Sequence, residues 1–470
     1  MKSAILTAAI LAALAGLTST ATAQSSQSSQ DTKASSGADH PFTWNDLTLY
    51  GVVDIGIANQ SHGTPISDYY AQGLEYGITS NSNHSVTALA PNGLSQSRIG
   101  LKGIHAFTDE CSGVFTVETR FSPLSGEIAN GPRSLIQNNG VALANQVSAS
   151  DSSQAGQLFS AAAFGGVTSK TYGTFTIGRQ NGLLYDNVLK YDPNGGSYAF
   201  SLIGFSAITA GAGDSEYNRL NGSARYTNQF GPVRAGLQYQ PAGQEVGGAA
   251  RQVNLGADIE HLSVDLTYVN KRNAIALASF AQPITTGQLA TLSAANLSPT
   301  NSLKATISDN SSWTLAAKYD LRALHAYAGY ERIAYGNPNA GGNFVQIGSS
   351  TVGGYFIGAL TTNAYVKTKV LQVEWAGLKY DFSPKIRLTG ALYRYGQNSY
   401  ATGSAAGCSS TVSTACSGGE IAYSLLGEYQ YNRYFDFYAG ALRSAVSGGL
   451  ASGFLNNSTV STMAGVRLSF

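Results

Sequence analysis

The 470-residue sequence is poor in charged, sulfur-containing and catalytic side chains. Only 12% of its residues are charged, and it has 3 cysteines, 2 methionines and 6 histidines. After Leu17 no stretch approaches the roughly eighteen consecutive apolar residues of a membrane-spanning helix, so the sequence excludes helical membrane proteins. Its 28 basic and 27 acidic residues leave a net charge of +1. That balance excludes the strong basic excess of a nucleic-acid-binding protein.

Motifs of catalysis and metal binding are also lacking. The three cysteines have no metal-ligand spacing, and the histidines fall mostly in the N-terminal region or between predicted strands. Neither a Gly-x-Ser-x-Gly turn in a plausible context nor a His-Glu-x-x-His helix occurs. Because hydrolases need a nucleophile beside a base, or clustered carboxylates, we predict that the chain is not an enzyme and uses no cofactor or metal.

The N-terminus has the three parts of a secretory signal peptide. Met1-Lys2 supplies the positive start, Ile5 to Leu17 the apolar core, and Ala21-Thr22-Ala23 the small-residue cleavage site. We therefore expect residues 1–23 to be removed. The Ser- and Gln-rich residues 24–46 are expected to form a loosely attached extension, and residues 47–470 the folded domain.

Sixteen strand-like segments follow, separated by connections that are alternately short and long. This pattern predicts an all-β, antiparallel up-and-down transmembrane barrel with short periplasmic turns and long extracellular loops. The segments are 47–59, 96–108, 112–122, 158–168, 172–179, 218–228, 233–240, 252–260, 262–272, 311–321, 323–335, 370–382, 385–397, 421–432, 435–446 and 458–470.

The last segment carries the strongest sign of a membrane barrel. Its apolar and polar residues alternate up to Phe470, so one face suits lipid and the other suits water. A terminal strand also needs partners on both edges, which a closed barrel provides. We therefore expect the barrel to lie in an outer membrane, surrounded by lipid.

Alternation also assigns the faces of other strands. In 262–272, Leu266 and Tyr268 oppose Asp265 and Thr267, and in 218–228, Arg219 and Arg225 oppose Leu220 and Tyr226. A lipid-facing charge near the membrane centre costs roughly 2 to 4 kcal/mol, so the charged faces are expected to line a wet lumen. In 370–382 the apolar residues change parity, which predicts a bulge near Ala376-Gly377 or a different register.

Several of these segments resemble strands of the general porins of Gram-negative bacteria. The similar stretches are Leu47-Thr48-Leu49-Tyr50-Gly51-Val52-Val53-Asp54, Ser97-Arg98-Ile99-Gly100-Leu101-Lys102-Gly103, Thr171 to Gln180, Asn218 to Tyr226 and Gly465 to Phe470. The resemblance implies a trimeric, sixteen-stranded barrel narrowed by an inserted third long loop, here about 180–217. It also implies an outer-membrane location and passive diffusion of small hydrophilic solutes and ions.

In that family, basic residues of the wall face acids of the inserted loop. The resemblance places Arg98 and Arg219 on the basic side, which Lys102 and Arg225 extend. The acids available in the loop are Asp186, Asp192, Asp214 and Glu216. The chain departs from the family where a wall arginine would fall, at Ala161, and where a lysine sometimes occurs, at Val52. Both departures are expected to weaken the transverse field of the pore.

Three further expectations concern assembly and alternatives. Cys408 and Cys416 share one Ser/Thr-rich loop, and for an exported chain this predicts a disulfide, with two unpaired thiols as the alternative; Cys111 has no candidate partner. Phe470 resembles the C-terminal signal that the outer-membrane insertion machinery recognises. Besides a general porin, a substrate-specific channel and a receptor or adhesin barrel with ligand-binding loops remain open.

Overall fold

The computed structural model describes residues 42–69, 80–81, 83–149, 157–205, 218–243, 247–280, 282–339 and 351–470. All of these residues belong to one compact unit, Thr32–Phe470. Its strands are β1 (Thr43–Trp44), β2 (Leu47–Gly63), β3 (His84–Pro91), β4 (Arg98–Ala106), β5 (Cys111–Arg120), β6 (Ala162–Ser169), β7 (Gly173–Asn181), β8 (Arg219–Phe230), β9 (Val233–Gln240), β10 (Ala250–Ile259), β11 (Leu262–Ala278), β12 (Ser302–Leu321), β13 (Leu324–Gly336), β14 (Thr351–Val352), β15 (Tyr355–Thr361), β16 (Lys369–Ser383), β17 (Ile386–Gln397), β18 (Gly418–Gln430), β19 (Phe435–Gly448) and β20 (Ser458–Ser469).

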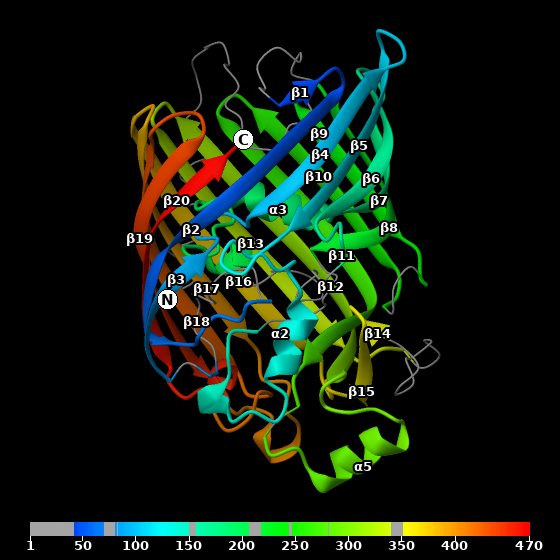
Figure 1. Ribbon diagram of the computed structural model, residues 1–470, viewed down its shortest axis with the longest axis vertical. Helices are drawn as coiled ribbons and strands as arrows, with labels where there is room; N and C mark the ends of the chain where they lie inside the picture. The colour runs from blue at the N-terminus through cyan, green and yellow to red at the C-terminus, as the bar shows by residue number, and fades with distance from the viewer. Residues whose placement is uncertain are drawn as a thin grey trace. The chain divides into compact units, whose positions relative to one another are not determined.

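The strands form a closed antiparallel barrel of sixteen strands (Figure 1). Each barrel strand pairs with the next barrel strand along the chain, β13 with β16 across the β14–β15 hairpin. Strand β20 pairs with β2 to close the ring, from Val52 opposite Ser469 to Gln60 opposite Ser461. The second strand of the barrel is interrupted: β2 pairs with β4 near its start and with β3 farther along. Closure leaves no free sheet edge in the wall, as spanning a bilayer requires.

The predicted strands are found at or near their expected positions, so the barrel prediction is confirmed. Two strands are longer than expected, because β11 and β12 continue to Ala278 and back to Ser302. Beyond them β15 adds to β12 in parallel orientation. The added parts of β11 and β12, and the strands β1, β3, β14 and β15, lie in stretches that were predicted to be loops or the N-terminal extension. In these stretches the alternation of apolar and polar residues is too short to distinguish a strand from a loop.

Strand β16 has no bulge at Ala376-Gly377, so that prediction is wrong. Its pairing with β13 and β17 is continuous through this point and shifts only near Ser383. Leu378, Tyr380 and Phe382 are exposed on the outer face, whereas Val373 and Trp375 are buried on the inner face. The apolar residues of β16 change from one face to the other because its inner face is apolar where the loop between β7 and β8 packs on it.

Strands β7 and β8 do contain an irregularity that the alternation did not predict. Their register shifts between Gly178 and Gln180, and Gly222 adopts a φ of +55°, a conformation that glycine tolerates without strain. Leu220, expected on the lipid face, is only 2% exposed. The face assignment for β11 agrees with the structure, since Leu266 and Tyr268 are exposed while Asp265 and Thr267 are buried.

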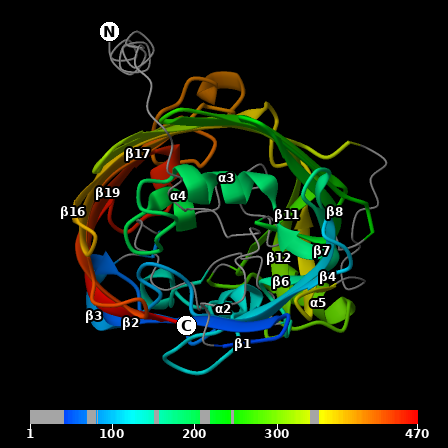
Figure 2. The same cartoon turned by 90° about the horizontal axis from the view of Figure 1, so that it is seen from above.

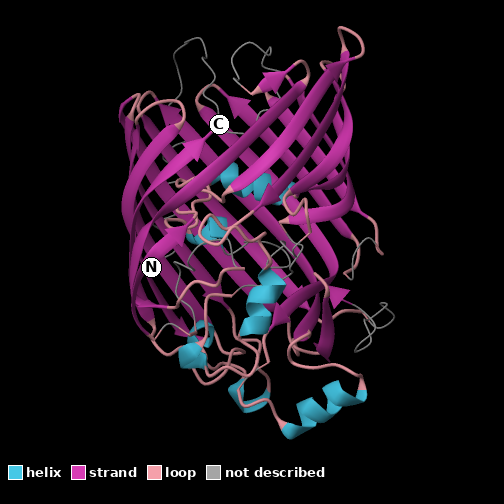
Figure 3. Cartoon of the chain, viewed as in Figure 1, coloured by secondary structure: helices cyan, strands magenta, loops and turns pink. Residues whose placement is uncertain are grey.

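The connections differ sharply in length at the two ends of the barrel (Figure 3). Tight turns such as 231–232 and 384–385 lie at one end, and long connections with helices lie mostly at the other. The helices are α2 (Gly131–Gln137), α3 (Leu183–Tyr191), α4 (Leu202–Phe205), α5 (Thr286–Ala294) and the 3-10 turns η1 (Leu143–Asn145), η2 (Gly403–Ala405) and η3 (Gly449–Ala451). None of the helices in the described ranges has the length and apolarity needed to cross a membrane.

Candidate pore constriction

The third long connection, residues 182–218, folds into the barrel over its described part, 182–205. It joins β7 to β8, and its helices α3 and α4 lie inside the ring of strands (Figure 2). The first two amides of α3 bond to wall glutamines: Leu183 N donates to Gln238 Oε1 (3.1 Å) and Leu184 N to Gln252 Oε1 (3.0 Å). These bonds satisfy two of the amide groups that a helix leaves unpaired at its N-terminus.

One face of α3 is apolar and packs against the barrel wall. Leu184, Val188 and Tyr191 belong to a buried cluster with inward-facing residues of the wall, and the Trp375 indole N–H donates to the Tyr191 carbonyl (3.0 Å). Each large apolar side chain buried in this way contributes about 1.5 to 3 kcal/mol. The wall residues of the cluster are Val269, Ala316, Ile333, Tyr335, Val373, Trp375, Ala391, Tyr393, Tyr395, Ala422 and Leu442.

Asp192 follows α3 and organises the turn after it. Its carboxylate accepts hydrogen bonds from the Tyr393 hydroxyl (2.7 Å) and the Gly196 N–H (2.7 Å), and the residue is only 2% exposed. Burial raises the pKa of the Asp192 carboxyl. The structure thus differs from the expectation that Asp192 contributes to the acidic side of the pore, because its carboxylate is hydrogen-bonded to Tyr393 of β17 and to the backbone of the turn.

Beyond the turn, the loop reaches the interruption between β3 and β4. Ser197 Oγ and Ala199 N both donate to the Gly93 carbonyl, at 2.7 and 2.9 Å. The Phe200 ring packs edge-on against Tyr438 of β19, with 6.2 Å between ring centroids. The described part of the loop is therefore held to the wall at both ends and along its length.

The opposite stretch of wall, from β4 to β8, carries Arg225 and four further arginines, which we call the arginine wall: Arg98, Arg120, Arg179 and Arg219. Arg98 and Arg120 are directly opposed across β4 and β5. Arg179 and Arg219 are held by adjacent carbonyls, because Arg179 Nε donates to Ser160 O (2.9 Å) and Arg219 Nε to Ala161 O (2.9 Å). The structure thus brings the predicted Arg98 and Arg219 into one basic cluster.

Glu118 lies within this cluster. Its carboxylate oxygens are 3.3 Å from Arg98 Nε and 3.8 Å from Arg120 Nε, and the Tyr50 hydroxyl donates to it (3.0 Å). With 7% of its side chain exposed, Glu118 is desolvated and paired to two arginines. Among the described residues, the arginine wall and Glu118 together carry an excess of positive charge.

Two tyrosines of the third loop face the arginine wall. The Arg219 guanidinium carbon lies 5.3 Å from the centroid of the Tyr185 ring. The Tyr198 hydroxyl donates to Gln96 Oε1 (3.2 Å), which also accepts from Arg120 Nη1 (2.6 Å). Burial, followed by the neighbouring Tyr198, raises the pKa of the Tyr185 hydroxyl. The described part of the loop therefore presents the neutral hydroxyls of Tyr185 and Tyr198 to the arginine wall.

The remaining predicted charges are placed as follows. Arg225 forms a 2.6 Å ion pair with Asp186 of α3, so this acid does face a basic residue of the wall. Lys102 is exposed, with its ammonium 5.6 Å from the centroid of the Tyr50 ring. Asp214 and Glu216 lie outside the described residues.

Lys190 adds a charged group that was not predicted as part of the site. Its ammonium lies 3.1 Å from Asp265 and 4.0 Å from Asp258, and Arg234 pairs with the same two carboxylates. Burial lowers the pKa of Lys190 to about 8, although Asp265 opposes the shift. Lys190 is therefore a cation that titrates near neutral pH.

Sequence reasoning missed Glu118, Arg120 and Arg179. Parity could have found the first two, because Glu118 and Arg120 share one face of a segment that was already recognised as a strand. Arg179 stood within the stretch that resembles the strand before the inserted loop. Tyr185 and Tyr198 gave no charge signal, and only the path of the loop reveals them.

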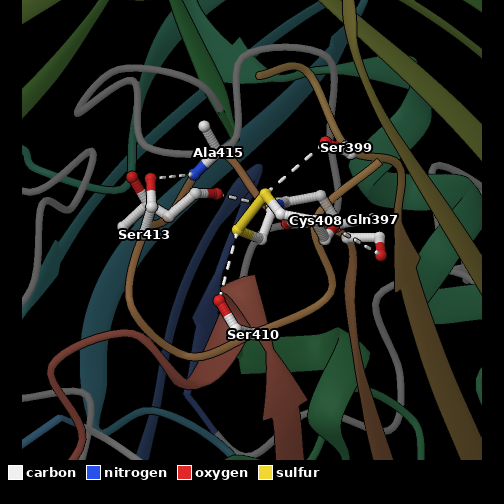
Figure 4. Close-up of a disulfide and its surroundings, with 9 residues drawn as sticks. Gln397, Ser399, Cys408, Ser410, Ser413 and Ala415 are labelled. Atoms are coloured by element: carbon white, nitrogen blue, oxygen red, sulfur yellow. Dashed lines mark hydrogen bonds between the residues drawn. A yellow bond between two sulfur atoms is a disulfide. The ribbon is translucent and has the colours of Figure 1, made fainter. Parts of the chain in front are cut away.

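The disulfide and the C-terminal residue lie away from this site. Cys408 and Cys416 are joined in the loop between β17 and β18, where Ser399 and Ser410 contact their sulfur atoms (Figure 4). Phe470 exchanges two 3.0 Å backbone hydrogen bonds with Gly51 of β2. Its ring also packs edge-on against Phe42, with 5.7 Å between centroids.

A closed barrel with a loop fixed inside it and a charged wall facing that loop defines an outer-membrane channel. The family model of the Gram-negative porins matches residues 7–413, and the chain belongs to this family. It is an outer-membrane porin, a channel for passive diffusion of small hydrophilic solutes. The alternatives of a substrate-specific channel and of a receptor or adhesin barrel are not favoured.

Solved structures share the fold at low sequence identity. An anion-selective porin from Comamonas acidovorans matches with a TM-score of 0.59 and 14% identity, over 90% of this chain and 99% of that one. The trimer form of OmpT, an outer membrane protein of Vibrio cholerae, matches with a TM-score of 0.51 and 12% identity, over 90% and 99%. A search of curated proteins finds no match to the chain.

Proposed function

We propose that the third long loop and the arginine wall form the constriction of the pore and that the channel prefers anions. The observation that carries the proposal is the charge balance of the arginine wall among the described residues, where four arginines lie with one carboxylate, that of Glu118. Positive charge in a narrow, low-dielectric passage concentrates anions and repels cations. The acid that faces the wall from α3, Asp186, is already neutralised by Arg225.

Burial of the arginines is compatible with this role. Arg120 and Arg179 are 7% exposed and Arg219 is 1% exposed, so they act on ions through their field and not by direct contact. Arg98 is partly exposed and reaches the lumen more directly. The Comamonas porin is anion-selective, but at 14% identity the likeness to it shows the fold alone. The preference proposed for this chain rests on its own arginines.

The test is the reversal potential of the purified protein in a planar bilayer across a potassium chloride gradient. An ohmic conductance with a reversal potential of the sign set by chloride supports the proposal. A cation-selective conductance would refute the anion preference. A protein that inserts but conducts no ions would contradict the channel itself.

We further propose a homotrimer that acts without catalysis. The trimer form of OmpT supports the assembly by analogy of fold, and sedimentation of the detergent-solubilised protein tests it. The lack of nucleophile and base motifs supports a passive channel. Removal of residues 1–23 and recognition of Phe470 by the insertion machinery belong to the same proposal, and the N-terminal sequence of the outer-membrane form tests the cleavage.

A further inference from the structure

Asp54 of β2 is a buried carboxylate whose hydrogen-bond donors, among the described residues, lie at the interruption of the second barrel strand and on β19. It is 0% exposed. Its oxygens accept hydrogen bonds from the backbone amides of Gly93 (3.2 Å), Leu94 (2.8 Å) and Ser95 (2.9 Å) and from the Tyr438 hydroxyl (2.7 Å). Four donors around one buried carboxylate form a charge-assisted network, which is stronger than neutral hydrogen bonds.

The same network fixes the backbone of the interruption. Asn92 N donates to the Asp54 carbonyl (2.8 Å), and Ser97 Oγ accepts from Asp54 N (3.0 Å). Asn92 adopts a φ of +61°, and its side chain accepts from the Ser97 amide (2.7 Å). The segment between β3 and β4 is thus shaped around Asp54 and not by strand pairing.

This segment is also where the third loop is attached. The Gly93 carbonyl accepts from both Ser197 and Ala199, while the Gly93 amide donates to Asp54. One peptide segment therefore links the buried carboxylate to the loop. Gly93 is suited to this place because a Cβ there would lie 2.2 Å from the Tyr438 hydroxyl.

Tyr438 makes a second link from Asp54 to the loop. Its hydroxyl donates to Asp54, and its ring packs edge-on against Phe200, the residue that follows the Ser197–Ala199 attachment. Phe200 and Tyr438 belong to one buried cluster with Leu94 and Met463. The backbone contact and the aromatic contact of the loop are consequently both oriented by the same carboxylate.

We infer that Asp54 is a positioning residue for the constriction: it holds the Gly93 carbonyl and the Tyr438 ring in the places where the third loop attaches. It acts through these two groups and does not touch the permeating ion. The inference rests on the proposed role of the loop as the constriction. Loss of the carboxylate should free the attached end of the loop while α3 stays fixed by its apolar face.

The experiment compares Asp54→Asn with wild type in single-channel recordings. The variant amide keeps the shape of the side chain, but its Nδ2 cannot accept a hydrogen bond, so at least one of the four donors loses its acceptor. We expect the frequency of spontaneous partial closures to rise at least roughly tenfold, the lower end of the factor expected when one hydrogen bond to a charged group is lost. Asp320→Asn is the matched control, because Asp320 pairs with Lys318 and with His325 of β13, and these contacts do not involve the third loop.

A double-mutant cycle separates positioning from general stability. Ser197→Ala removes one bond to the Gly93 carbonyl and should raise closure frequency by itself. If Asp54 acts through Gly93, the effects of Asp54→Asn and Ser197→Ala combine to less than their product. Independent effects that multiply fully, or a lowered melting temperature with unchanged closures in Asp54→Asn, would overturn the inference.

A second variant serves if Asp54→Asn does not insert. Tyr438→Phe removes one donor to Asp54 and keeps the ring against Phe200, so the same cycle with Ser197→Ala applies, and full multiplication again overturns the inference. Failure of this inference can be distinguished from failure of the proposed constriction. If the loop and the arginine wall do not form the constriction, variants of the arginine wall leave the reversal potential unchanged, whatever the closure frequency of Asp54→Asn.

Discussion

The ion pair between Glu118 and Arg98 allows a prediction in which two substitutions shift the ion selectivity in opposite directions. Glu118 lies 3.3 Å from Arg98 Nε, so Glu118→Gln and Arg98→Gln each remove one unit charge from nearly the same place. The first variant leaves the wall more positive and should increase the preference for anions. The second should decrease it by a similar amount. The double variant should return close to the wild-type value.

The size of the effect follows from Coulomb's law. A unit charge about 7 Å from the path of an ion in water contributes about 0.6 kcal/mol, which favours one sign of ion about 2.7-fold and disfavours the other equally. The chloride-to-potassium permeability ratio should therefore change about sevenfold at low salt. In about 0.15 M salt, screening reduces the change to about twofold.

Reversal potentials across a salt gradient measure both shifts. Arg394→Gln is the control, because this variant also removes one positive charge. The Arg394 side chain is 60% exposed and pairs with Glu374, and the alternation along their strands places both residues on the outer face of the barrel. Shifts of the same sign in Glu118→Gln and Arg98→Gln, or an Arg394→Gln shift as large as theirs, would refute the proposed constriction.

Three further predictions concern charge, assembly and the outer loop. Raising the pH from about 7 to about 9 should deprotonate Lys190, whose pKa is lowered to about 8, and so reduce anion preference; in Lys190→Met the reversal potential should lose this pH response. Deleting Phe470 removes two backbone bonds to Gly51 and should sharply lower the amount of heat-modifiable barrel in outer-membrane fractions, so wild-type amounts would contradict its role. Replacing Cys408 and Cys416 by Ser should leave conductance unchanged while costing the loop about 2 to 3 kcal/mol, and non-reduced peptide mapping that finds free thiols in the wild type would contradict the bond.

The strands could be predicted because lipid and water impose a period of two on the sequence. That rule placed the barrel strands and gave the faces of β11 correctly. It failed where the inner face does not meet water. Val373 and Trp375 point inward and are apolar because they contact the third loop, and Leu220 is buried where the register of β7 and β8 shifts.

The partners of individual charges were harder to predict than the strands. Asp186 and Asp192 are six residues apart in one loop, yet α3 directs one to Arg225 and the turn directs the other to Tyr393. Sequence gives the number of acids available, whereas the rotation of a nine-residue helix decides which wall each one meets. Charge composition alone therefore cannot define a constriction.

The inner wall of this barrel is divided between two kinds of surface, and the division explains the position of the loop. From β11 to β19 the inward residues that meet the loop are mostly apolar or aromatic, whereas from β4 to β8 the wall carries arginines. A loop with an apolar helix face gains free energy only against the first surface. Packing there leaves Tyr185 and Tyr198 directed toward the arginine wall and Asp186 directed toward Arg225. Apolar residues on the lumen-facing side of several neighbouring strands thus indicate where an inserted loop packs. The groups that select ions are then expected on the polar wall opposite.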